Sequence, residues 1–261
     1  PVQITANQIT TENDSLVYAG GKVEITRSDL DARSDSAFLD GGREFARLMI
    51  QPVIIGKGER GYTLRGTQVE LYTRNRIVQR VLAQAAARVT SEDMLLTADT
   101  IDLRVDGNKA QAAYIWGKSR ARAVSPDRDL IADSLAVRMP NQQLRELRAF
   151  RDAMATTFPD TAKVRTGERD WLKGDTIYAF FDSTETARAA APAAPSPRSA
   201  VAILPALAPT PARPDSTSRP ATTSSDSTRR PQLREMQSIG HASARYQVES
   251  QGGTPQRPAI N

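Results

Sequence analysis

The sequence Leu95-Leu96-Thr97-Ala98-Asp99-Thr100-Ile101-Asp102-Leu103-Arg104-Val105-Asp106-Gly107-Asn108 contains a strand and the turn that ends it. Between Ile101 and Val105, aliphatic residues alternate with polar ones, which is the period of a strand with one buried face. Asp106-Gly107-Asn108 follows, and these residue types tolerate the positive φ that a tight hairpin requires. The stretch therefore predicts a β-hairpin whose first strand begins near Ala98-Asp99-Thr100.

The same unit of a small residue, a polar residue, a spacer and an aliphatic or small apolar residue recurs along the chain. Its six copies are Ala6-Asn7-Gln8-Ile9, Ser34-Asp35-Ser36-Ala37, Gly66-Thr67-Gln68-Val69, Ala98-Asp99-Thr100-Ile101, Ala132-Asp133-Ser134-Leu135 and Gly174-Asp175-Thr176-Ile177. The polar positions are separated by 28, 32, 32, 34 and 42 residues. Turn signals follow at Asn13-Asp14, Gly41-Gly42, Arg74-Asn75, Asp106-Gly107, Pro140-Asn141 and Asp182-Ser183.

A period near 32 residues, made of a strand, a turn and a return strand, indicates a repeat architecture. One hairpin cannot bury its apolar face alone, whereas stacked hairpins share a continuous core. The alternation favours antiparallel strands with one solvated face. We therefore predict an all-β fold of stacked antiparallel strands. An ordinary β-sandwich and a parallel β-helix are the alternatives, although the rungs of a β-helix are usually shorter.

Two stretches also have helical propensity. Residues 77–89 are rich in Ala, and residues 148–154 have a similar character. We predict strands in both, because each occupies the position of a strand that returns from a predicted hairpin turn. The repeat thus takes precedence over the local composition in these two places.

The recurrent polar residue has a structural explanation. An Asp at the start of each strand, such as Asp99, is expected to bond local backbone N–H groups. A calcium site would need several oxygen ligands close together, and no Asp-x-Asp-x-Gly cluster occurs. His241 has no partner of its own kind and is expected to be structural. Gly56-Lys57-Gly58-Glu59-Arg60-Gly61 departs from the dinucleotide-binding pattern and is expected to be a loop.

The distribution of charge argues against a nucleic-acid partner. The chain has 35 basic and 30 acidic residues, but residues 1–186 carry 26 of each, so the excess lies in residues 187–261. A charge-balanced folded part is poor evidence for a phosphate-tracking surface. Cys is absent and His occurs once, which excludes thiolate and multi-His metal sites and Cys nucleophiles. No run of eighteen apolar residues predicts a transmembrane helix.

The composition changes after residue 183. Residues 184–231 are rich in Ala, Pro, Ser and Thr and lack periodicity, which predicts a disordered insertion. Ile203, Leu204 and Leu207 within it are either a short partner-binding motif or incidental apolar residues of a linker.

Order is predicted to resume at Gln232-Leu233-Arg234-Glu235-Met236, which repeats Gln143-Leu144-Arg145-Glu146-Leu147. Since the earlier copy is a predicted return strand, the later one is expected to return along the strand after Asp175. Residues 1–183 and 232–261 would then form one β-domain with the insertion at a hairpin tip. We expect the next strand at residues 240–246 and a final repeat cut short at its C-terminal end.

These repeats resemble the OstA/LptA-type organic-solvent-tolerance domain of lipopolysaccharide export, which also occurs in LptC and at the N-terminus of LptD. The resemblance rests on the Ala-Asp-x-Ile-like units, on Gly21-Lys22-Val23-Glu24-Ile25 and on residues 240–246 followed by Pro258-Ala259-Ile260-Asn261. It covers most of residues 2–183 and 232–261. It implies a twisted, V-shaped β-jelly roll whose apolar interior holds lipid acyl chains. The long insertion departs from the family.

The aliphatic residues that follow the repeated units are the candidates for lipid contact. They are Val69, Leu71, Ile101, Leu103, Val105, Leu135, Val137, Ile177 and, with an aromatic side chain, Phe181. Arg104 and Arg138 are the candidates for pairing with lipid phosphates at the rim of the slot. The alternative is that the aliphatic residues fill a closed core and the arginines are solvated, as in a β-repeat scaffold without a ligand.

The resemblance implies a non-enzymatic bridge protein in the periplasm, associated with the inner or outer membrane, without a metal or cofactor. Its partners would be lipopolysaccharide or a similar glycolipid, together with other jelly-roll export components joined by edge-strand pairing. Free sheet edges also predict head-to-tail self-association. An enzyme would need convergent titratable groups in a cleft, and the sequence offers no such set.

Overall fold

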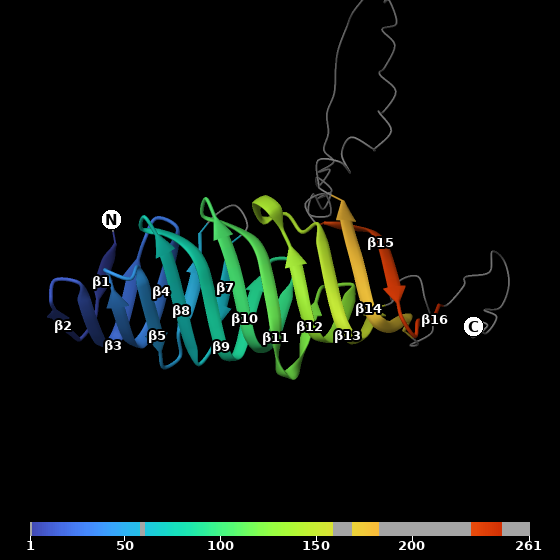
Figure 1. Ribbon diagram of the computed structural model, residues 1–261, viewed down its shortest axis with the longest axis horizontal. Coiled ribbons are helices and arrows are strands. Elements are labelled where there is room, and N and C mark those ends of the chain that lie inside the picture. The colour runs from blue at the N-terminus through green and yellow to red at the C-terminus, as the bar shows by residue number, and fades with distance from the viewer. Residues whose placement is uncertain (1, 58–60, 159–168, 183–230, 247–261) are drawn as a thin grey trace, which may run out of the picture.

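The computed structural model describes residues 2–57, 61–158, 169–182 and 231–246, whose regular structure is strands and one 3₁₀ turn (Figure 1). The first strands are β1 (Gln3–Thr5), β2 (Gln8–Glu12), β3 (Leu16–Thr26), β4 (Leu30–Asp40), β5 (Phe45–Met49), β6 (Val53–Gly56), β7 (Tyr62–Arg65) and β8 (Gln68–Arg74). Then come β9 (Ile77–Ser91), β10 (Leu95–Asp106), β11 (Lys109–Val124), β12 (Arg128–Arg138), the turn η1 (Pro140–Gln142), β13 (Glu146–Thr157), β14 (Trp171–Asp182), β15 (Gln232–Ile239) and β16 (Ser243–Arg245). The predicted all-β class is confirmed.

The strands form one antiparallel sheet in which neighbours follow the order of the chain. Its path is β1-β3-β4-β5-β8-β9-β10-β11-β12-β13-β14-β15. The pairs β1 and β2, β5 and β6, β7 and β8, and β15 and β16 are each the two halves of one bent strand. The two stretches with helical propensity lie in β9 and β13, so both predictions of strand are confirmed. The stack is elongated across its strands, with the N-terminal strands at one end and β15 and β16 at the other (Figure 1).

Each long strand bends near its middle, which divides the sheet into two halves. In β4, residues 36–40 pair with β5, whereas residues 30–33 pair with β6. We call the half that contains the predicted hairpin turns half-sheet A, and the half beyond the bends half-sheet B. In β10, residues 100–106 belong to half-sheet A and residues 95–97 to half-sheet B.

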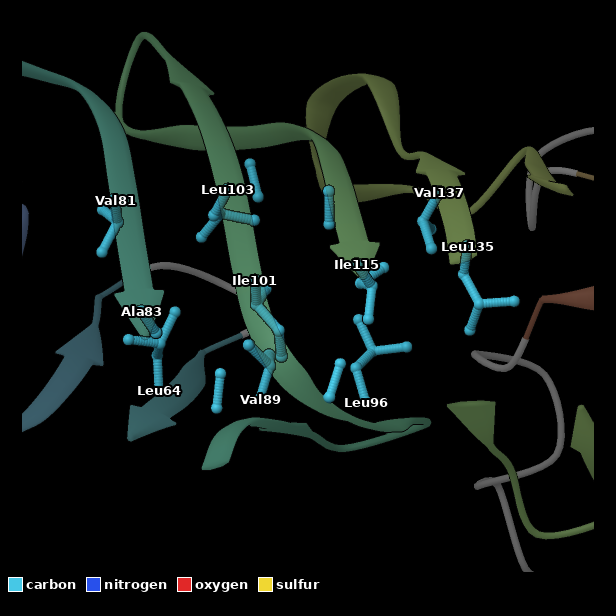
Figure 2. Close-up of a cluster of buried hydrophobic side chains, with 14 of the residues drawn as sticks. Leu64, Val81, Ala83, Val89, Leu96, Ile101, Leu103, Ile115, Leu135 and Val137 are labelled. Atoms are coloured by element: carbon cyan, nitrogen blue, oxygen red, sulfur yellow. The ribbon is translucent and has the colours of Figure 1, made fainter. Parts of the chain in front are cut away.

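The two half-sheets face each other and share one core. Leu64, Val89 and Leu96 come from half-sheet B, and Ile101 and Leu103 come from half-sheet A (Figure 2). All five side chains are buried in the same cluster. The fold is therefore a two-layered stack of antiparallel strands, and burying one face of each layer against the other provides the hydrophobic stabilisation.

The polar residue of the repeated unit lies at a bend and not at the start of a strand as predicted. The carboxylate of Asp99, in the middle of β10, accepts hydrogen bonds from the backbone N–H of Lys118 and, at 2.8 Å, from that of Ser119. Asp35 accepts one from the N–H of Lys22 at 3.4 Å. These two carboxylates accept hydrogen bonds from backbone N–H groups, but the groups belong to the neighbouring strand and are not the local ones predicted. The strand itself passes through the bend and begins earlier.

The neighbouring strand usually makes the bend with two consecutive residues in the left-handed backbone region. These pairs are Gly21-Lys22, Ile50-Gln51, Ala85-Ala86, Arg151-Asp152 and Gly240-His241. The pairing register shifts at the same points. Non-glycine residues seldom adopt positive φ, so residue types alone do not reveal these bends.

The C-terminal strands correct one prediction. β15 returns antiparallel along β14, as the copied pentapeptide predicted. Residues 240–246 do not form the next strand, because β16 also pairs with β14 and continues β15 beyond the bend at Gly240-His241. The predicted disordered insertion, except its last residue Pro231, and the end of the final repeat lie outside the described residues. In the ranges that the structure describes, no helix is long and apolar enough to cross a bilayer.

Replacing Gly21 by Ala is expected to destabilise the fold by about 1–2 kcal/mol. Gly21 has a φ of +72°, and a Cβ there would lie 3.0 Å from the Cβ of Asn7. Gly20 is the matched control, because a Cβ at that position meets nothing within 4 Å. Urea denaturation of both variants measures the difference. Equal midpoints for Gly21→Ala and Gly20→Ala would contradict the strain at the bend.

The end strands predict association that depends on protein concentration. Within the described part of the chain, β2 pairs only with β3, and β15 pairs only with β14. A free strand edge pairs with another edge unless a charge blocks it. Light scattering should show larger particles as concentration rises, and Ile9→Lys or Ile239→Lys should each reduce them. A mass that stays monomeric over a wide concentration range would rule this association out.

Candidate functional site

The nine residues predicted to face inward all lie in the interior between the half-sheets. Val105 and Phe181 are half-buried and pack against the core. The other seven are at most 5% exposed, namely Val69, Leu71, Ile101, Leu103, Leu135, Val137 and Ile177. Strand alternation sets the direction of these side chains, and the predicted orientation is correct.

Near the bends, the interior is filled by side chains. Ile101, Leu135 and Ile177 are the first aliphatic residues after three of the bends, and each is at most 2% exposed. Ala149 pairs across strands with both Leu135 and Ile177 and is itself inaccessible. This part of the interior is a close-packed core, as the alternative prediction of a filled scaffold requires.

Farther from the bends, the half-sheets leave two adjacent cavities of about 90 Å³ each. The first is lined mainly by carbon, from Val89 and Leu96 of half-sheet B and from Leu103, Ala113 and Val137 of half-sheet A. The second is lined by Ala123, Leu130 and Ala155 of half-sheet B and by Ala179 and Phe181 of half-sheet A. We call the two cavities together the groove.

Sequence reasoning identified part of the groove lining. Leu103 and Val137 line the first cavity and Phe181 the second, whereas the other six predicted residues line neither. Met94 and Leu144, which line both cavities, were missed. Both lie in connections between strands, where the alternating pattern gives no direction. The available signal was the first apolar residue after a polar turn, at Met94 after Ser91-Glu92-Asp93 and at Leu144 after Asn141-Gln142-Gln143.

Arg104 and Arg138 lie on the outer face of half-sheet A and not at the groove, which corrects the predicted rim. Each follows an inward aliphatic residue, so strand alternation turns it outward. Arg104 forms an ion pair of 2.8 Å with Asp102, which also accepts two hydrogen bonds of 2.9 Å from Arg80. Arg138 pairs with Glu146 at 3.4 Å. Both arginines are compensated by carboxylates on the side of the sheet opposite the groove.

The carboxylates with perturbed pKa values also lie outside the groove. The hydrogen bond of 2.6 Å from Arg148 lowers the pKa of Glu146, with burial acting in the opposite direction. The backbone N–H of Ser119 is the largest cause that lowers the pKa of Asp99 at its bend. Both groups therefore stay ionised at neutral pH and stabilise the sheet from outside.

Tyr62, at the first cavity, has a clearly shifted pKa. It lines the first cavity and packs against the core. Its ring occupies the space that a Cβ on Gly56, its cross-strand partner, would need. Desolvation by burial raises the pKa of Tyr62 to about 12, and the charge of Asp29 adds to the effect. The hydroxyl therefore stays protonated and serves as a neutral polar group at the wall.

The described ranges contain no group of three or more His, Cys, Asp or Glu residues suited to hold a metal ion. The lone histidine, His241, has its Nδ1 2.9 Å from Oδ2 of Asp175 at the last bend. Its place fits the predicted structural role. The Gly56–Gly61 stretch connects β6 and β7, as predicted for a loop, although residues 58–60 lie outside the described residues.

No protein-family model matches the sequence, and no curated protein matches it. Among solved structures, the chain is similar to LptH, the LptA-homologous periplasmic component of the lipopolysaccharide transport device from Pseudomonas aeruginosa. The identity is 13%, the match covers 48% of this chain and 94% of LptH, and the TM-score is 0.42.

Tyr62→Phe is expected to change the stability of the protein at alkaline pH. The pKa of Tyr62 is about 12 in the folded chain and about 10 when unfolded. A raised folded pKa stabilises the native state fully below pH 10, and this contribution is lost as the pH rises toward 12. Urea denaturation at several pH values should show that loss in the wild type and less of it in Tyr62→Phe.

Absorbance titration of tyrosinate provides the independent check. The difference between wild type and Tyr62→Phe should titrate near pH 12 or at alkaline unfolding. A difference that titrates near pH 10 would show that the Tyr62 hydroxyl is hydrated.

Proposed function

We propose that this chain binds the acyl chains of a lipid in the groove between its half-sheets. The observation that supports this most directly is the pair of adjacent apolar cavities, about 90 Å³ each. Apolar cavities stay dry and take up apolar ligands. Each CH₂ moved from water into such a site gains about 0.8 kcal/mol. An extended hydrocarbon chain is the ligand class that suits such a lining.

The direction of the groove supports a chain-shaped ligand. The first cavity draws on strands from β7 to β12 and the second on strands from β11 to β15. Because the strands are stacked in chain order, the two cavities follow each other along the long axis of the molecule. A hydrocarbon chain lying along this axis would cross the strands and contact both half-sheets.

The repeat resemblance supplies the rest of the proposal. The lipid would be lipopolysaccharide or a similar glycolipid, and the location the periplasm, next to one of the membranes. The end strands would pair with other jelly-roll export components, so that lipid passes along a bridge toward the outer membrane. With Arg104 and Arg138 on the outer face, contact with the lipid would come mainly from the acyl chains, although Arg128 also lines the second cavity.

We also propose that the chain acts without catalysis. The shifted carboxylates, Asp99 and Glu146, lie at a bend and on the outer face. Tyr62, at the groove, keeps its proton because its pKa is raised to about 12. The groove also has Glu92, Asp93 and Asp127 in its lining, at the connections between strands, so the absence of catalysis is proposed from the mainly apolar wall, which can bind and orient a lipid.

A second candidate function is a β-repeat scaffold without a ligand. The filled core around Ile101, Leu135 and Ile177 favours it, since those side chains leave no space between the half-sheets. The two candidates differ in one observable, which is whether lipid reaches the interior at the groove.

A photoreactive leucine analogue at Leu103 tests the proposal. Leu103 lines the first cavity and is 3% exposed, whereas Arg104, the next residue, faces solvent on the opposite side of the sheet. After illumination with lipopolysaccharide, the analogue at position 103 should yield an adduct and the same analogue at 104 should not. Equal adducts at the two positions, or none at either, would contradict lipid binding in the groove and favour the β-repeat scaffold without a ligand.

A further inference from the structure

The two cavities of the groove are separated by a small set of shared residues. Asp93, Met94, Leu144 and Pro231 line both the first cavity and the second. A residue that lines two adjacent cavities stands at the boundary between them. The groove is therefore one apolar space interrupted at a single point along its length.

Two of these shared residues, Met94 and Leu144, pack in or against the core. They come from opposite half-sheets. Met94 lies in the β9–β10 connection at the end of half-sheet B, half-buried and packed against the core. Leu144 lies in the β12–β13 connection at the end of half-sheet A and is 9% exposed. Residues from both walls thus stand at the boundary between the two cavities.

The backbone around Met94 is held in place. Its carbonyl accepts a hydrogen bond of 2.9 Å from the N–H of Ser91, and its own N–H donates one of 3.2 Å to the Ser91 hydroxyl. The side chain is unbranched with three rotatable bonds, which lets methionine adapt to irregular gaps. A fixed backbone with an adaptable side chain restricts a passage without closing it permanently.

We infer that Met94 and Leu144 form a partition that limits the length of hydrocarbon chain the groove accepts. The inference rests on the proposed function and identifies the two residues that set the length of the bound hydrocarbon chain. A short chain fills one cavity and stops at the partition. A longer chain gains nothing from its further CH₂ groups until the Met94 side chain moves aside. The ligand class is accordingly a lipid with chains short enough for one cavity, or one that displaces Met94.

The test is a series of saturated fatty alcohols of increasing length, whose affinity is measured by displacement of a fluorescent apolar probe. In the wild type, affinity should rise about fourfold per CH₂ and then reach a plateau. In Met94→Ala, and separately in Leu144→Ala, the rise should continue to longer chains. Two variants are used because Leu144 is buried and its truncation alone could prevent folding.

Met139→Ala and Met236→Ala are the matched controls. Met139 lines only the first cavity and Met236 only the second, so each truncation enlarges one cavity without joining the two. Both controls should keep the plateau at the wild-type length or move it by no more than the volume of the removed side chain. A plateau that shifts as far in Met139→Ala as in Met94→Ala would overturn the partition.

Crystals under xenon pressure separate this inference from the lipid proposal. Xenon occupies dry apolar cavities whatever their biological ligand. The wild type should show two separate xenon positions, and Met94→Ala should add one at the place of the missing side chain. If that pattern appears but no alcohol binds, the partition stands and lipid binding fails. If xenon positions do not change in Met94→Ala, the partition is wrong even where alcohols bind.

Discussion

The fold depends on hydrogen bonds that join neighbouring strands at the bends. Bending a strand removes backbone groups from the ladder, and unpaired buried backbone groups are costly. The repeated polar residue restores these partners. The N–H of Asn7 donates to the carbonyl of Gly21 at 2.8 Å, and that of Asp175 donates to the carbonyl of Gly240 at 2.8 Å. At Asp99, the carboxylate instead accepts hydrogen bonds from the backbone N–H groups of Lys118 and Ser119 on the next strand.

The position of the bends decides what the interior can hold. Next to a bend the two half-sheets are joined by their own backbone, so the space between them is narrow and is filled by residues such as Ile101 and Ala149. At the far ends the half-sheets are connected only by side chains, and there the cavities form. The filled core and the groove are thus two consequences of one geometry, and the residues of each are set by their distance from the bend.

Much of this fold could be predicted from periodicity. Alternation placed Leu103 and Val137 inward, and turn residues such as Asp106-Gly107 placed the hairpins. The bends could not be predicted, because Ala85-Ala86 has the composition of a helix and adopts a left-handed backbone only through tertiary pairing. The error over Arg104 and Arg138 had a simpler source. A residue next to an inward position must face outward, and the strand period already contained that information.

The chain order of the strands gives the molecule a modular length. In the described part of the chain, each bent strand pairs only with the strands before and after it in sequence, so much of the stability comes from local interfaces, as in other repeat proteins. Addition of one strand-turn-strand unit would lengthen the stack without altering the remaining pairings. The 42-residue interval before Asp175 shows that the stack also accepts extra residues between units. The length of the stack is therefore set by the number of repeats.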